Sequence, residues 1–229
     1  MKKTNSFGIV SLTRFLLTCE KADEARRWTP IFFALTIWLI FQFGHEYKQT
    51  LSGDLSWVSE FHLALFFAAE LSIVSAFTPD LEDNGLNFLL QGLPSPLYLF
   101  VSKILVTCIQ IVRIWLPLIL VHSSWFIPQG YELGTVWPWA NGLLTILGLS
   151  TLGILLSALT MTTKVREILF PFLFFPMVIP VLLCSMESSI AYVQQDLTTA
   201  QTWLWLLTGF NVIFMTLGLL LFDQWSSQQ

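Results

Sequence analysis

The sequence predicts an all-α polytopic membrane protein with six transmembrane helices and an N-terminal amphipathic helix at the membrane interface. The first observation is composition, because hydrophobic residues make up 55% of the chain and charged residues only 11%. A soluble domain carries about 25% charged residues. The second observation is a series of long stretches without Asp, Glu, Lys or Arg. Stretches of about 17 to 25 apolar residues cross the hydrocarbon core as helices, which satisfy their own backbone groups.

These stretches place the expected transmembrane spans. They lie near 28–44, 61–79, 104–121, 137–160, 168–186 and 202–222. The longest uncharged stretch, 133–163, is expected to be one helix preceded by a loop, since two helices there would each have only about 15 residues. The connections leave no room for a second folded unit, so residues 1–229 are expected to form one membrane domain.

Lysine and arginine predict the orientation, because these residues concentrate in cytoplasmic loops. Six lie before the first span, one at 103, and two between the fourth and fifth spans, so nine share one side under a six-span arrangement. The opposite side has only Lys48. We therefore expect both termini, the 80–103 connection and the 164–167 loop in the cytoplasm.

Residues 6–27 have the spacing of an amphipathic helix. Apolar positions recur every three or four residues around Arg14 and Lys21. Such a helix lies along the membrane surface, and we expect it to turn into the first span at Pro30. The alternative is a soluble helix packed on a partner protein.

Several classes of function are disfavoured by composition. The net charge of −4 disfavours nucleic-acid binding, which needs a basic surface. The three cysteines, Cys19, Cys108 and Cys184, are far apart and are expected to be free thiols rather than metal ligands. We expect no catalytic residue, no metal site and no directly bound cofactor in this chain.

The connection at 80–103 is the most informative segment. Asp80 and Asp83 can cap the free N–H groups of a short helix, and acidic residues there complement the helix dipole. Leucines give this helix an apolar face, and the Leu-Pro-Ser-Pro sequence at 93–96 ends it. The segment is either a simple connector or a rigid contact for a cytoplasmic partner.

Several motifs resemble the B subunit of the cytochrome c maturation haem exporter (CcmB type). The acidic turn at 80–83, Gly85, the leucines that follow, the proline-rich turn and Lys103 form the first match. Phe175-Pro176 with Ile179-Pro180, preceded by 158–160 and Lys164, forms the second, and Phe32-Phe33 after Trp28 resembles the start of the first span. The chain departs from the family pattern at Val74 and Ser75, where Glu and Arg are usual, and at Leu93, where Pro is common.

The resemblance implies an ABC transporter permease subunit in a bacterial inner membrane. Its expected partners are a separate ATPase, the C and D membrane subunits and a second copy of the chain, with haem as a substrate of the complex. No phosphate-binding loop occurs in this sequence, so ATP hydrolysis is expected elsewhere. The residues expected to form the ATPase-coupling helix are Asp80, Glu82, Asp83, Gly85, Leu86 and Leu89.

Polar residues within spans are costly and usually face a bundle interior. Glu70 and Arg113 lie in adjacent spans, so we expect them to pair. His45, His62 and His122 are candidate haem ligands, although histidine at a helix end near the interface is the interpretation we favour. Helix kinks are expected at Pro117, Pro171, Pro176 and Pro180.

Two other functions are compatible with parts of the sequence. One is an assembly scaffold that transports nothing. The other is an intramembrane lipid-modifying enzyme, which would need a second acidic motif besides Asp80, Glu82 and Asp83. The permease subunit accounts for more of the chain.

Overall fold

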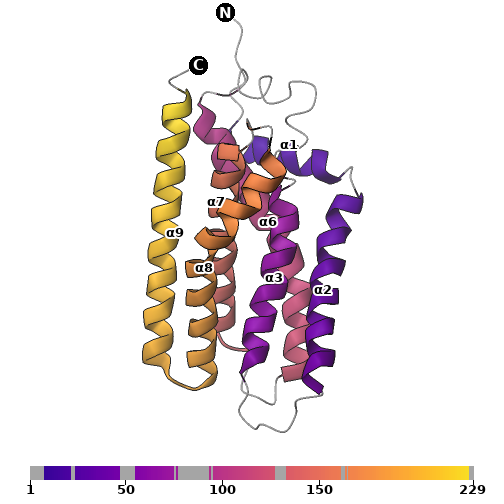
Figure 1. Cartoon of the computed structure of the whole chain (residues 1–229). Coiled ribbons are helices and arrows are strands. Elements are labelled where there is room, and N and C mark those ends of the chain that lie inside the picture. The colour runs from indigo at the N-terminus through magenta and orange to yellow at the C-terminus, as the bar shows by residue number, and fades with distance from the viewer. Residues whose placement is uncertain are drawn as a thin grey trace, which may run out of the picture.

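The computed structural model is a bundle of α-helices (Figure 1). It describes residues 8–21, 24–46, 55–74, 76, 93, 95–126, 133–160, 163 and 165–226. Over these residues the only regular secondary structure is α-helix, as predicted. The helices are α1 (Ile9–Lys21), α2 (Glu24–Glu46), α3 (Ser56–Val74), α6 (Pro96–Phe126), α7 (Trp137–Thr160), α8 (Arg166–Val193) and α9 (Leu197–Ser226).

Six long helices lie side by side, and α1 crosses one end of them (Figure 1). α2 begins and α9 ends at that same end, which we call the α1 end, and we call the opposite end the far end. Five of the long helices, α3 and α6 to α9, are long and apolar enough to cross a membrane. α2 has 23 residues and runs beside them. The described chain therefore crosses the bundle from the α1 end and returns to it.

α7 is the central helix of the bundle. It contacts α3, α6, α8 and α9. In its apolar, membrane-crossing stretch 67% of the helix is buried inside the bundle, against 22% for the corresponding stretch of α9. Three glycines allow this close packing, because a Cβ at Gly142 would overlap Trp115, and Cβ atoms at Gly148 and Gly153 would lie 2.9 Å from Val181 and 2.6 Å from Ile73. Small residues at helix interfaces serve this purpose in membrane proteins.

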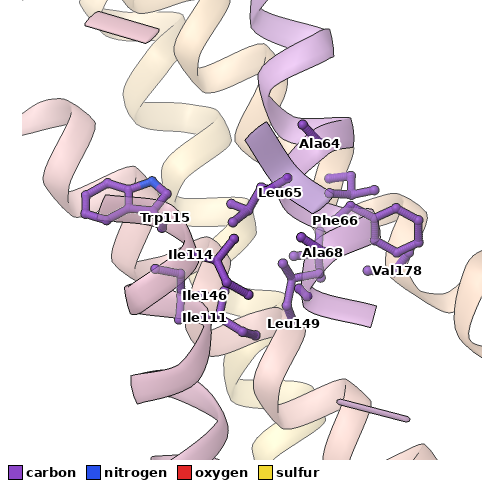
Figure 2. Packing of buried hydrophobic residues seen from close by; sticks show 14 of the residues in the cluster. Ala64, Leu65, Phe66, Ala68, Ile111, Ile114, Trp115, Ile146, Leu149 and Val178 are labelled. Carbon is purple, nitrogen blue, oxygen red and sulfur yellow. The ribbon is translucent and has the colours of Figure 1, made fainter. Parts of the chain in front are cut away.

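The apolar core surrounds α7 (Figure 2). Leu65 and Phe66 from α3, Trp115 from α6, Leu149 from α7 and Val178 from α8 belong to one cluster of buried side chains. The outward faces of α8 and α9 are apolar as well, with Phe172 and Trp205 about three-quarters exposed. A surface of this kind suits contact with lipid, which needs no charge.

Several helix boundaries differ from the expected spans. α3 spans Ser56–Val74 instead of 61–79, and α8 continues to Val193 instead of 186. Both helices contain a glutamate near an end, Glu60 and Glu187, at which the uncharged stretch of the sequence stops. The helices continue through these residues because the backbone bonds of a helix do not depend on whether the side chain is charged.

The expected turn at Pro30 is wrong. α2 begins at Glu24, and Pro30 lies inside it. A proline near the start of a helix is tolerated because the first four N–H groups have no partner within the helix, and Pro30 lies only shortly beyond them. α1 itself is amphipathic as predicted. Leu12 and Leu16 are buried, whereas Val10 and Arg14 on the opposite face are exposed.

Candidate coupling site and buried polar network

The expected coupling helix, Asp80 to Leu89, lies outside the described residues, which resume at Leu93 after Ala76. The structure does describe the two helix ends that this segment connects. α3 ends at Val74, and Ala76 continues its last turn with a hydrogen bond from the Ala76 N–H to the Ile73 carbonyl, 2.9 Å. α6 begins at Pro96, and the Ser95 hydroxyl accepts a bond from the Leu97 N–H, 3.3 Å.

Lys103 ties these two ends together. Its Nζ donates to the Ala76 carbonyl oxygen at 2.8 Å, and the residue is only 5% exposed. A cation at the carboxyl end of a helix is favoured, because the last carbonyls of the helix point toward it. We call Lys103 and Ala76 the clamp. The clamp holds the end of α3 to α6 next to the two points where the described chain leaves α3 and enters α6.

α1 braces the same part of α6. Leu12 and Leu16 pack with Leu99 and Val106 in one buried cluster. The Ser102 hydroxyl, next to the clamp lysine, lies 3.4 Å from the Ile9 carbonyl oxygen, to which it donates. The interfacial helix, the start of α6 and the end of α3 are therefore one connected unit at the α1 end.

A second polar site lies toward the far end, buried between α3, α7 and α8. His62 Nδ1 lies 2.7 Å from the Val58 carbonyl oxygen, and its Nε2 lies 2.8 Å from the Ser185 hydroxyl. Ser185 also contacts the Thr145 hydroxyl. The Asn141 amide donates to the Ser185 carbonyl at 3.0 Å and to the Ser189 hydroxyl at 2.8 Å. We call His62, Asn141, Thr145, Ser185 and Ser189 the polar network.

His122 on α6 occupies a neighbouring aromatic pocket. The Trp38 indole N–H donates to His122 Nδ1 at 3.1 Å. The ring centroids of Trp57 and Phe61 lie 5.0 and 4.8 Å from the centroid of the His122 imidazole. His122 is 1% exposed and His62 is 5% exposed. This arrangement joins α2, α3 and α6 at the far end.

His62 and His122 lie near the far-end termini of α3 and α6, and both are buried inside the bundle, so their position relative to the membrane interface stays a prediction. Each also has a ring nitrogen already engaged by the protein. The described residues contain no group of three or more His, Cys, Asp or Glu that could hold a metal ion. The side chain of His45 lies outside what the structure describes.

Glu70 and Arg113 are both half-buried, on α3 and α6, which contact each other. The two helices are antiparallel, with Phe61 beside His122 at one end and Ala76 beside Lys103 at the other. This register puts Glu70 and Arg113 at similar depth, and their pairing stays a prediction. Pro117 lies inside α6, and Pro171, Pro176 and Pro180 lie inside α8, where kinks also stay a prediction.

The sequence contained a signal for the polar network that our sequence analysis did not use. Asn141 and Thr145 are four residues apart, and so are Ser185 and Ser189, in otherwise apolar helices. Residues at this spacing lie on one face of a helix. Two such polar pairs predict that those faces meet inside the bundle, but not which helices meet.

The fold defines a multi-pass helical membrane protein, with small residues at its centre and apolar side chains on its outer helices. The family model described as CcmB protein matches residues 11–223, and the chain belongs to this family. It is therefore a transporter permease subunit of a bacterial inner membrane, in cytochrome c biogenesis. Comparison with curated proteins and with solved structures gives no match.

Proposed function

We propose that this chain couples a separate cytoplasmic ATPase to haem delivery, or to release of a haem chaperone, on the opposite side of the membrane. The observation that carries the proposal is the family match over residues 11–223. Under this proposal the α1 end faces the cytoplasm, in agreement with the distribution of Lys and Arg. The further partners would be the C and D membrane subunits, and a second copy of the chain is a candidate partner as well.

Coupling requires a contact that differs between the states of the ATPase. The 77–95 connection suits such a contact, because both of its ends are fixed by described residues. Lys103 holds the end of α3 to α6, and Ser95 caps the start of α6. An ATPase that moved this connection would move α3 and α6, and both helices pack directly on α7.

The connection also carries the residues expected to bind the ATPase. Leu86 and Leu89 would place apolar side chains in a groove of the partner. Asp80, Glu82 and Asp83 would lie at the start of the helix, and Gly85 stands between these acidic residues and the leucines. Helix-in-groove recognition uses apolar anchors at this spacing. The anchors supply the affinity, and the acidic cap maintains the helix that presents them.

The experiment is co-purification of the ATPase with variants of the chain in mild detergent. Leu86→Asp and Leu89→Asp should leave the chain in the membrane but release the ATPase and abolish c-type cytochrome assembly. Asp83→Ala should have a weaker effect, since loss of a cap costs about 1 kcal/mol.

Gln91→Asp is the matched control. In the expected helix it would add the same charge on the face opposite to the one that Leu86 and Leu89 share. This variant should retain the ATPase. Normal ATPase recovery and cytochrome assembly in both leucine variants would show that the connection is only a linker. The contact would then be sought at α1 or at residues 164–167.

A further inference from the structure

The polar network contains a continuous row of hydrogen-bonding groups between two backbone carbonyls. The row runs from the Val58 carbonyl through the His62 ring, the Ser185 hydroxyl and the Thr145 hydroxyl to the Asn141 carbonyl. The last contact, from the Thr145 hydroxyl to the Asn141 carbonyl oxygen, is 2.7 Å. Both ends of the row are oxygen atoms that can only accept.

The number of protons in this row depends on the charge of His62. Each of the four contacts needs one proton, and each hydroxyl supplies one. A neutral imidazole supplies one more, which leaves one contact without a proton, whereas an imidazolium supplies two and completes all four. We propose that His62 is a proton-binding site, and that this closed arrangement of α3, α7 and α8 is the one in which its ring carries both protons.

The surroundings supply more acceptors than donors. The Asn141 amide uses both of its N–H groups, on the Ser185 carbonyl and the Ser189 hydroxyl. Its Oδ1 is buried and has no hydrogen-bond partner among the described residues. Burial disfavours a charged ring, but an oxygen lies within hydrogen-bond distance of each ring nitrogen, the Val58 carbonyl at Nδ1 and the Ser185 hydroxyl at Nε2, and both can accept from a doubly protonated ring.

His122 has the opposite environment. Its Nδ1 accepts from the Trp38 indole N–H, which is a donor only, so a second ring proton would break that bond. Among the described side chains of the three helices that form this site, the other titratable residues nearest in sequence are Glu60 on α3 and Cys184 and Glu187 on α8, and the sequence of α7 has none. We therefore assign the extra proton to His62 and a neutral ring to His122.

Loss of the proton has a structural consequence that goes beyond coupling to an ATPase. With a neutral His62, the row has one hydrogen bond fewer. The Ser185–Thr145 contact joins α8 to α7 and the His62–Ser185 contact joins α3 to α8, whereas the contacts at the two ends of the row lie within α3 and within α7. Loss of the hydrogen bond at either of the two central contacts would loosen the junction of the three helices at the far end.

The test is ¹⁵N NMR of the full-length chain in lipid nanodiscs, with ¹⁵N-labelled histidine. The chain has three histidines, so spectra of His45→Gln and His122→Gln assign the ring of His62. At neutral pH we expect two protonated ring nitrogens for His62 and one for His122. A His62 ring with an unprotonated Nε2 at every pH from 5.5 to 8.5 would overturn the proposal.

Thr145→Val tests whether the second proton of His62 depends on the Thr145 hydroxyl. Without the Thr145 hydroxyl, Ser185 can donate to a neutral His62, so the ring should lose its second proton at neutral pH. Thr145→Ser keeps the hydroxyl and should keep both protons.

Thr151→Val on the same helix removes an equivalent hydroxyl, which donates to the Leu147 carbonyl outside the row. It should leave the His62 signals unchanged. Identical His62 spectra for Thr145→Val and the unsubstituted chain would contradict the proposal. If Thr145→Val does not fold, Ser185→Ala removes the link between the ring and Thr145 and should likewise leave a neutral ring.

Discussion

The two ends of the bundle are stabilised in different ways. At the α1 end a buried lysine joins α3 to α6, and apolar side chains of α1 pack on the start of α6. At the far end amide, hydroxyl, imidazole and indole side chains join α2, α3, α6, α7 and α8. The α1 end also carries the connection that is expected to meet the ATPase, whereas the polar network is enclosed by the chain itself.

This difference indicates a division of roles. A site that receives force from a partner needs exposed chain with fixed ends, and the clamp provides the fixed ends. An enclosed network can respond only to small species such as a proton or to movement of its own helices. Substitutions at the α1 end should therefore change partner binding, whereas substitutions at the far end should change stability or protonation and leave partner binding intact.

The largest effect is expected for Lys103→Met at the clamp. Loss of a hydrogen bond from a charged group costs about 1.5 to 3 kcal/mol, which corresponds to at least about a tenfold change in an equilibrium. We expect at least that loss in the amount of co-purifying ATPase and in c-type cytochrome. Lys103→Arg keeps a donor and a charge and should recover part of both. An unchanged Lys103→Met variant would remove the clamp from the coupling mechanism.

Gly142→Ala tests the far end. A Cβ at this position would overlap Trp115, which is only 2% exposed. Overpacking of this kind costs about 1 to 3 kcal/mol, so the Tm in detergent should fall by roughly 2 to 4 °C per kcal/mol. Gly209→Ala on α9 is the control, because nothing lies within 4 Å of its Cβ. ATPase recovery should be normal in both variants.

Glu70→Gln and Arg113→Gln test whether a charge pair connects the two ends. If the residues pair, either single change leaves an uncompensated charge in the bundle, and the double change removes both. Each single variant should then give less folded protein, with partial recovery in the double variant. Strictly additive losses, measured as monodisperse protein after solubilisation, would show that the residues do not interact.

The all-helical fold and the amphipathic N-terminal helix could be predicted from the sequence because composition and periodicity are local properties. The helix ends near Glu60 and Glu187 could not be predicted in this way, because a charge inside an apolar stretch does not by itself end a helix. The burial of His62 and His122 was also missed. It depends on which faces of α3, α6, α7 and α8 meet, and the spacing of the histidines along the chain does not determine this.

The smallest effect is expected for Asp196→Ala in the connection between α8 and α9. The Thr199 N–H donates to Asp196 Oδ1 at 3.1 Å, which caps the start of α9. Hydrogen bonds from the side chain and backbone of Thr199 hold the pKa of this carboxyl below its ordinary value. Its stabilisation is thus present above the ordinary pKa of aspartate and is lost as pH falls through the lowered value.

Asp196→Ala should therefore lower the Tm slightly at neutral pH, by less than Gly142→Ala. The difference from the unsubstituted chain should disappear under acid conditions, once the carboxyl is protonated. Thermal denaturation at neutral pH and at a pH below the lowered pKa of Asp196 gives the comparison. A difference that did not change with pH would mean that the carboxylate charge contributes nothing to the cap.

The most direct test of the division between the two ends is a paired co-purification of the ATPase with Leu86→Asp and with Thr145→Val, at equal membrane levels of the chain. The account predicts that Leu86→Asp releases the ATPase and that Thr145→Val retains it in full. Retention of the ATPase by Leu86→Asp together with its loss from Thr145→Val would contradict the account, because it would place partner binding under the control of the far end.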